Sequence, residues 1–294
     1  MNTVTDDSQF SQNATPYRQL LVKVFPHGFT TTVLGMKILL LGFGSIGRHI
    51  VRLLDHEFTA MVRDIDAHRE RGTLGVKLIT EQHFDQALAE ADLVVEAAGV
   101  DVAKQFLPKV HKPFVLTSVG ALADSATAEA IMTPHLHVTN GAIGGFDLLA
   151  AVADQIDDVS ITTSKDPVGL IQPWMSDDEA ARLEELQEPE TLFVGNPIEA
   201  INKFPGNVNV AVALAYATRG SQPWSEALGR VKVTLVADPQ RPESAHRIDT
   251  SGEAGRFTFE FVSSPSPINP ATSGTTALSL AATIARVEPH IRRN

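Results

Sequence analysis

Cysteine is absent from this sequence, which excludes disulfide bonds, thiolate nucleophiles and cysteine metal ligands. The absence fits a reducing compartment. Long apolar runs are absent too. The longest, Ile38 to Phe43, has the length of a strand and falls short of the ~20 residues that a membrane span needs. We therefore expect a soluble cytoplasmic protein that has no membrane partner.

Positive charge is scarce. The 24 Lys and Arg residues face 35 Asp and Glu residues, which gives a formal net charge of -11. An acidic chain repels phosphate backbones, so we expect no nucleic-acid partner. The 294 residues are 43% hydrophobic and 20% charged, which is ordinary for a globular protein. The length suffices for two modest domains or one large domain.

Two kinds of catalytic site find no support. No G-x-S-x-G elbow follows a strand, so a serine hydrolase is not indicated. His135 and His137 have the spacing of one strand face, but no carboxylate follows at the spacing of a metal ligand. We predict no metal site, and we interpret the two histidines as a pair on an edge strand.

The first 35 residues differ from the rest. They are rich in Asn, Gln, Thr and Ser and have no clear periodicity. The apolar stretch Leu20 to Phe25 is interrupted by Lys23 and preceded by Asp6 and Asp7, which is a poor signal peptide. We treat residues 1–35 as an N-terminal extension, disordered or accessory, and we begin the folded part at Met36.

Strands alternate with helices in the first half. A helical face formed by Ile46, Ile50, Leu53 and Leu54 follows the first strand. Such alternation implies right-handed crossovers and a parallel sheet. The expected class is therefore α/β, beginning with a Rossmann dinucleotide-binding domain. The apolar runs that predict these elements are Lys37 to Leu41, Phe58 to Val62, Leu93 to Ala98, Val102 to Leu107 and Pro113 to Thr117.

A G-x-G-x-x-G motif lies between the first strand and the first helix, which is the context that makes it informative. Gly42 permits the tight turn, Gly44 lets the backbone approach a pyrophosphate, and Gly47 lets the helix pack on the strand. Ser45 and Ile46 begin the helix whose amides face the phosphates. The remaining candidate contact with NAD or NADP in this half is Ala98, where the strand over residues 93–98 ends.

The choice between NAD and NADP falls on Arg63 and Asp64 after the second strand. An acidic residue there bonds the ribose 2′-hydroxyl, whereas an Arg accommodates a 2′-phosphate. Because the chain offers both, the two cofactors remain open, and both residues could also be solvated loop charges.

The pattern of apolar and polar residues changes after residue 146. Val159 to Thr163, Arg230 to Ala237 and Arg256 to Phe261 alternate between apolar and polar residues, which favours a mostly antiparallel sheet. We expect residues 147–265 to form a second α+β domain that binds the substrate and joins two copies into a homodimer. Residues 266–294 return to the first domain, 36–146, as a helix. That helix is capped at Thr272-Ser273 and has an apolar stripe formed by Leu278, Ala281 and Ile284.

Several motifs in this order resemble the L-aspartate dehydrogenase family, from about Met36 to the last helix. Each alone would be unremarkable. The segments that carry the resemblance are Ser118 to Asp124, Gly141 to Asp147, Phe204 to Ala211, Ala237 to Pro239, His246 before Gly252, and Pro265 to Ser273.

The resemblance implies reversible NAD(P)-dependent oxidation of L-aspartate to iminosuccinate, which hydrolyses to oxaloacetate and ammonia. In some organisms such an enzyme feeds NAD biosynthesis. The family's cofactor-binding alanine and asparagine fall on Ala121 and Asn209, and its catalytic histidine falls on His246. From sequence alone His246 lies in a polar loop. Imidazole titrates near neutrality and can exchange protons with the substrate nitrogen or with water.

The substrate side is less defined. The family usually has Arg-Lys-Pro where this chain has Ser164-Lys165-Asp166-Pro167, and the connection from Asn209 to His246 is longer than usual. A dicarboxylate needs cations or hydrogen-bond donors. The candidates are Lys165, which could also be a solvated surface charge, with donors near Ser118, Thr272 and Ser273.

Two other functions remain open from the sequence. One is an iminosuccinate reductase or another amino-acid dehydrogenase, which keeps the cofactor and changes the direction or the substrate. The other is a dinucleotide-sensing protein without turnover. The intact His246 and the ordinary acidic composition favour an enzyme.

Overall fold

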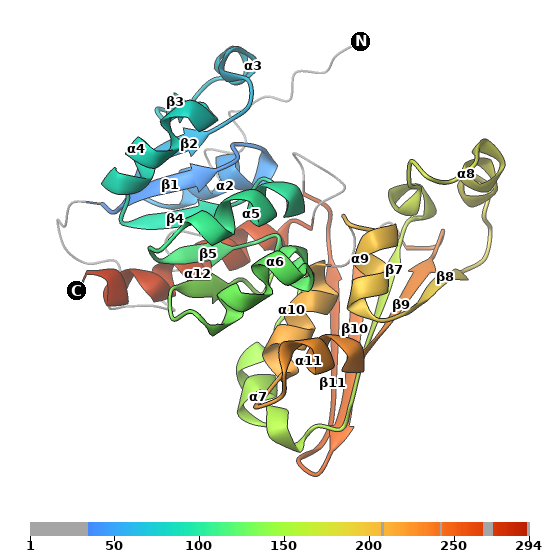
Figure 1. The fold of residues 1–294 in the computed structure, drawn as a ribbon. Coiled ribbons are helices and arrows are strands. Elements are labelled where there is room, and N and C mark those ends of the chain that lie inside the picture. Colours follow the sequence, from blue (N-terminus) through green and yellow to red (C-terminus); the bar gives the residue numbers. More distant parts are fainter. Residues whose placement is uncertain (1–34, 207–208, 242, 267–272, 293–294) are drawn as a thin grey trace.

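The computed structural model describes residues 35–206, 209–241, 243–266 and 273–292, arranged in two lobes that are each built on a sheet (Figure 1). The predicted N-terminal extension lies outside these residues, apart from Gly35. Within them, no helix is long and apolar enough to cross a membrane. The α/β class with a parallel and a mostly antiparallel sheet is confirmed. The division of the chain into domains at residues 146 and 265 remains a prediction.

The first sheet has six parallel strands in the order β3-β2-β1-β4-β5-β6, the order of a dinucleotide-binding fold. Because successive strands are added on one side of β1 up to β3 and on the other side from β4 onward, a crevice forms at the carboxyl ends of β1 and β4. The strands are β1 (Lys37–Leu41), β2 (Glu57–Met61), β3 (Lys77–Ile79), β4 (Leu93–Glu96), β5 (Phe114–Leu116) and β6 (Leu136–Val138).

Helices cover both faces of this sheet, and its central strands β1 and β4 are accordingly apolar except for Lys37 at the start of β1 and Glu96 at the end of β4. Leu40 and its neighbours on one face pack with α2 (Ser45–Leu53) and α12 (Thr275–Ile291). Leu39 and Leu41 face the other way, toward α4 (Phe84–Glu90) and α5 (Val100–Phe106). The remaining helices of this lobe are α3 (Ile65–Glu70) and α6 (Ser125–Ala128), with 3-10 turns η1 (Glu81–His83), η2 (Leu107–Lys109), η3 (Val119–Ala123) and η4 (Glu129–Met132).

The last helix lies on the first lobe although its sequence follows the second. Ala277, Leu280, Ala281 and Ile284 of α12 are buried against α2 and the parallel sheet. Leu278, which the sequence placed in the buried stripe, is only partly buried. Gly274 is the N-cap, and Ser273 accepts from the amide of Thr275 at 3.3 Å. Thr272 lies outside the described residues.

The second sheet has five strands in the order β11-β10-β7-β9-β8. Three of its four pairs are antiparallel, and β7 pairs with β9 in parallel. The strands are β7 (Asp158–Lys165), β8 (Glu190–Gly195), β9 (Val231–Ala237), β10 (Ser244–Gly252) and β11 (Gly255–Ser263). Its helices are α7 (Phe146–Ala151), α8 (Asp177–Glu184), α9 (Pro197–Lys203), α10 (Asn209–Thr218) and α11 (Trp224–Arg230), with η5 (Ala153–Gln155) and η6 (Pro167–Leu170).

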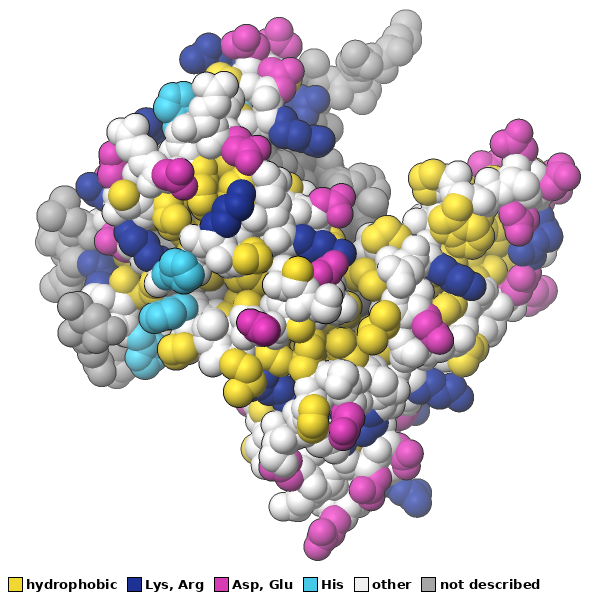
Figure 2. Space-filling model, viewed as in Figure 1, with side chains coloured by type: hydrophobic (Ala, Val, Ile, Leu, Met, Phe, Trp, Pro, Cys, Tyr) yellow, Lys and Arg dark blue, Asp and Glu magenta, His cyan; other side chains and the backbone are white. Residues whose placement is uncertain are grey.

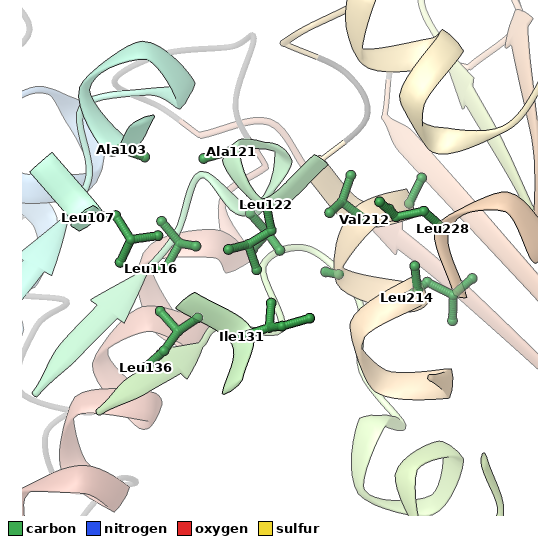
Figure 3. Close-up of a cluster of buried hydrophobic side chains, with 14 of the residues drawn as sticks. Ala103, Leu107, Leu116, Ala121, Leu122, Ile131, Leu136, Val212, Leu214 and Leu228 are labelled. Carbon is green, nitrogen blue, oxygen red and sulfur yellow. The ribbon is translucent and has the colours of Figure 1, made fainter. Parts of the chain in front are cut away.

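Apolar side chains join the two lobes. Leu122 of η3 and Ile131 of the first lobe belong to one buried cluster with Val212, Leu214 and Leu228 of the second (Figure 3). The indole nitrogen of Trp224 also donates to the carbonyl oxygen of Leu122 at 2.7 Å. A continuous core of this kind fixes the orientation of the second sheet relative to the crevice of the first.

Candidate active site

A cavity of about 1310 Å³ lies at the carboxyl ends of the parallel strands, where such folds bind ligands. Figure 2 shows this face of the molecule hollowed between the first lobe and the arm that carries α8 and α9. Its walls include the loops after β1, β2 and β4 and the end of α9. Among the residues that line it are Gly42, Gly44, Val62, Arg63, Ala98, Pro205 and Asn209.

The glycine loop after β1 has the geometry that a dinucleotide requires. Gly42 has φ of 93°, and a Cβ there would lie 2.6 Å from the Cβ of Ala98. A Cβ on Gly47 would lie 2.7 Å from the carbonyl oxygen of Gly42. Among the described residues other than its chain neighbours, a Cβ on Gly44 would meet no atom within 4 Å, and it would occupy space in the cleft that a pyrophosphate needs. The loop therefore fits the cofactor.

The two residues that follow the loop take different positions. The hydroxyl of Ser45 lies 3.3 Å from that of Ser266, in the segment that leads back to α12. Ile46 lines a second, smaller cavity deeper between the lobes. The segment that returns from the second lobe is therefore attached beside the glycine loop.

Arg63 and Asp64 have different surroundings in the structure. Arg63 lines the cleft. The carboxylate of Asp64 accepts from the amide of Ala67 at 3.0 Å and is the N-cap of α3. His68, which the sequence did not single out, also lines the cleft, and among the described residues its Nδ1 atom is buried without a hydrogen-bond partner. Burial and the charges of Arg71 and Arg48 lower the pKa of His68.

The second cavity, about 160 Å³, collects the polar residues expected near the substrate. It shares Gly206 and Asn209 with the large cavity, so the two spaces adjoin. A dinucleotide in the first and a small acid in the second would therefore lie next to each other. The polar residues that line it are Thr117, Ser118, Thr139, Asn140, Lys165, Asn209, Ser244, His246, Ser273 and Thr276.

His246 does not lie in an exposed loop, as the sequence suggested. It is part of β10, is 3% exposed, and its Nδ1 atom lies 2.9 Å from the hydroxyl of Thr163 on β7. Burial and the nearby charge of Lys165 lower the pKa of His246 to about 3. The imidazole of His246 therefore stays neutral well below physiological pH, whereas the sequence suggested a histidine that titrates near neutrality.

Lys165 is the last residue of β7 and lies in the same cavity as His246 because β7 and β10 pair directly. It is not a solvated surface charge. Burial lowers the pKa of Lys165 to about 8, so this amine is the group in the cavity that titrates near physiological pH. The acid that separates it from Pro167 is accounted for locally, since Asp166 accepts from the amide of Val168 at 3.0 Å.

Asn209 joins the two lobes. Its side-chain oxygen accepts from the amide of Gly120 at 2.8 Å. Ala121, the next residue, is completely buried and is not among the described residues that line either cavity. The structure thus brings Asn209 to the cleft, whereas Ala121 belongs to the buried cluster that contains Leu122.

The buried acid Glu96 was not identified from the sequence. Glu96 is 0% exposed and ends β4, where it accepts hydrogen bonds from the loops after β4 and β5, including the hydroxyl of Ser118. A carboxylate that closes an otherwise apolar strand was the only signal in the sequence. Within the described part of the chain, no three His, Asp or Glu side chains are grouped to hold a metal.

Comparisons with known proteins agree with this geometry. Residues 147–287 match the family "Aspartate dehydrogenase, C-terminal", and residues 42–135 match "Homoserine dehydrogenase, NAD binding domain". The L-aspartate dehydrogenase of Methanosarcina mazei is 31% identical over 86% of this chain and 97% of that protein. L-aspartate dehydrogenase 2 of Bordetella pertussis is 36% identical over 66% of this chain and 73% of that protein.

A solved structure shows the same arrangement. The crystal structure of aspartate dehydrogenase from Thermotoga maritima superposes with a TM-score of 0.65 at 25% sequence identity. The match covers 87% of this chain and 96% of that one. The likeness therefore includes both lobes and the crevice between them.

Proposed function

This chain belongs to the L-aspartate dehydrogenase family, and on that premise we propose that it oxidises L-aspartate with NAD+ or NADP+. The products are iminosuccinate, the reduced cofactor and a proton, and water then converts the imine to oxaloacetate and ammonia. The observation that carries the proposal is the meeting of Lys165 and His246 in a cavity that adjoins the dinucleotide cleft.

The residues of the cleft fit a nicotinamide dinucleotide. Gly44, the residue before α2, leaves space for the pyrophosphate at the start of that helix, and Asn209 lines the same cleft. A nicotinamide bound in this cleft would supply the hydride acceptor for the oxidation. The chain's own residues then have two tasks, which are to orient the aspartate and to remove a proton from its ammonium group.

Lys165 is our candidate for proton removal. Hydride leaves the α-carbon only after the ammonium has become an amine, and a base must lie within reach of that nitrogen. With a pKa of about 8, Lys165 is partly in its neutral form at physiological pH and can accept that proton. When protonated, Lys165 is also a cation that can bind a carboxylate of the substrate. Lys165 therefore has two roles in this proposal, which are to bind the substrate and to accept its proton.

His246 acts as a neutral partner in this proposal. The Thr163 hydroxyl holds its Nδ1 atom, which leaves Nε2 as the nitrogen for the substrate or for the attacking water. His246→Ala should lower kcat for aspartate by about 10–100-fold, because it removes a hydrogen-bonding nitrogen from the substrate cavity. Binding of the dinucleotide should stay unchanged, because the glycine loop and Asn209 hold it.

A direct assay tests the function. Purified protein with L-aspartate and NAD+ or NADP+ should produce reduced cofactor, followed at its absorbance maximum, and the reverse reaction should consume it with oxaloacetate and ammonia. D-Aspartate, L-glutamate and L-malate are the matched controls for configuration, chain length and the amino group. Turnover of L-malate or L-glutamate at a higher kcat/KM than L-aspartate would reject aspartate as the substrate.

A further inference from the structure

Glu96 connects two loops that border the active site. Its Oε1 atom accepts from the amides of Ala98 at 2.7 Å and Gly99 at 2.8 Å, in the loop after β4. Its Oε2 atom accepts from the amide of Ser118 at 2.8 Å, and Oε1 also accepts from the hydroxyl of Ser118 at 2.9 Å, after β5. One fully buried carboxylate thus holds three backbone amides and one hydroxyl.

The three amides favour the ionised form of Glu96. Burial raises the pKa of this carboxyl above its ordinary value, whereas the four hydrogen bonds oppose the rise. A backbone N–H can only donate, so each of the three amides needs an acceptor oxygen. A protonated carboxyl could direct its hydrogen only to the oxygen of the Ser118 hydroxyl, and the protonated oxygen would then be a poor acceptor for the amides of Ala98 and Gly99. The arrangement therefore fits a carboxylate anion, to which Ser118 gives its hydroxyl hydrogen.

The hydrogen bond from Ser118 to Glu96 determines which hydrogen bonds the Ser118 hydroxyl can form with a ligand in the cavity. A serine hydroxyl has one hydrogen and two lone pairs. With the hydrogen directed to Glu96, only lone pairs remain for a ligand, and Ser118 lines the same small cavity as Lys165 and His246. In this arrangement the Ser118 hydroxyl has no hydrogen left for a substrate carboxylate, which differs from the donor role expected from the sequence. It can accept from an N–H group.

We propose that Ser118 accepts a hydrogen bond from the amino group of the substrate, and that Glu96 is the positioning residue that gives Ser118 this polarity. Aspartate carries one such donor, its α-nitrogen, because its two carboxylates are acceptors only. The contact survives the reaction, since amine and imine both keep an N–H. This inference rests on the proposed function, because it assigns the substrate group that the same cavity recognises.

Succinate separates the two roles of Ser118, because it has both carboxylates of aspartate and no amino group. In Ser118→Ala we expect KM for L-aspartate to rise about 10–100-fold, the scale of a lost hydrogen bond to a charged donor. The Ki of succinate as a competitive inhibitor should change less than about twofold. The affinity for reduced cofactor, from a fluorescence titration, should stay the same. Ser118→Thr keeps the hydroxyl and should restore much of the loss.

Glu96→Gln tests the positioning role. The NH2 group of the Gln side chain would face one of the N–H or O–H groups from which Glu96 accepts, and two donors cannot bond to each other. The hydroxyl of Ser118 therefore loses its fixed orientation. We expect KM for aspartate to rise in Glu96→Gln, and to rise little further when Ser118→Ala is added, because the two changes remove one interaction. Ser118→Gly provides a second truncation should Ser118→Ala fail to fold.

Each other result contradicts the inference. Equal losses for aspartate and succinate would mean that Ser118 serves a carboxylate, and a loss confined to the cofactor would mean that it serves the nicotinamide. Unchanged constants in Ser118→Ala, or additive effects of the two substitutions, would remove the contact or its dependence on Glu96. A wild-type protein that does not turn over aspartate would reject the proposed function itself, which is a separate outcome.

Discussion

At the scale of single residues, Lys165 and His246 share one cavity and titrate far apart, with pKa values of about 8 and about 3. Burial lowers both, because a desolvated cation is unfavourable whichever side chain carries it. The ordinary pKa of lysine is high, so burial brings the pKa of Lys165 close to physiological pH. The ordinary pKa of histidine is already near neutrality, so burial takes the pKa of His246 below the physiological range. Lys165 therefore controls how the proposed reaction depends on pH.

We predict that kcat for L-aspartate oxidation rises with pH through about 8, since only the neutral amine of Lys165 accepts a proton. Lys165→Met should lower kcat by about 10²–10⁴-fold and abolish this rise. Lys232→Met, on an exposed position of β9, is the matched control. Initial rates from pH 6 to 10 at saturating substrate measure both. A variant of Lys165 that keeps the wild-type profile would exclude Lys165 as the base.

The glycine loop allows a prediction in which binding and stability separate. Gly44→Val should abolish binding of reduced cofactor with little change in Tm, because its side chain enters open cleft space. Gly47→Ala should lower Tm instead, because its Cβ would lie 2.7 Å from the carbonyl oxygen of Gly42. Fluorescence titration and thermal unfolding of both variants provide the comparison. Normal cofactor affinity in a folded Gly44→Val protein would place the dinucleotide elsewhere.

Cofactor choice should depend on Arg63. Arg63 lines the cleft after β2, and a guanidinium there favours a 2′-phosphate. We predict that Arg63→Ala raises KM for NADP+ more than KM for NAD+. Asp64→Ala should change the two equally and lower the free energy of unfolding by about 1 kcal/mol, because its carboxylate caps α3. Steady-state kinetics with both cofactors decide this. Equal effects of Arg63→Ala on the two would make Arg63 a bystander.

At the scale of elements, α12 supports the site although it is distant in sequence from the loops it packs beside. Ser273 and Thr276, at the start of α12, line the small cavity, and the buried face of α12 packs against α2. The hydroxyls of Ser45 and Ser266 meet at the same place. Loosening α12 should therefore disturb the substrate cavity and the glycine loop together.

Leu280 is 0% exposed in α12, and Leu280→Ala should lower the free energy of unfolding by about 2–5 kcal/mol. Leu278, a partly buried residue on the same helix, gives the matched control Leu278→Ala, with a smaller loss. Urea unfolding monitored by circular dichroism measures both. Equal losses in the two variants would contradict the packing of α12 described here.

Elements differ in how well the sequence predicted them. The run from Lys37 to Leu41 and the glycine motif after it act locally, so strand, loop and helix could be predicted. Strand β10 could not, because its inward positions include the polar residues His246 and Thr250, which hide the alternation. Glu96 likewise resembles any strand end until the loops after β4 and β5 are placed together in space.

At the scale of the whole molecule, the two lobes share one buried cluster across η3 and α10. We therefore predict a single cooperative unfolding transition. The fluorescence of Trp224 reports on the junction between the lobes, since its indole donates to Leu122, and far-UV circular dichroism reports on both sheets. Thermal unfolding followed by fluorescence and by circular dichroism should give the same Tm. Separate transitions would show that the lobes unfold independently. The homodimer and the cytoplasmic location remain predictions.

Gly206 and Asn209 belong to both cavities, and this has a thermodynamic consequence. Because two ligands would contact the same residues, we expect the binding free energy of each to depend on the presence of the other. Whatever factor the dinucleotide applies to the dissociation constant of the dicarboxylate, the dicarboxylate applies to that of the dinucleotide. A substitution at Asn209 should therefore alter this reciprocal factor, which calorimetric titration of each ligand in the presence of the other would measure from both directions.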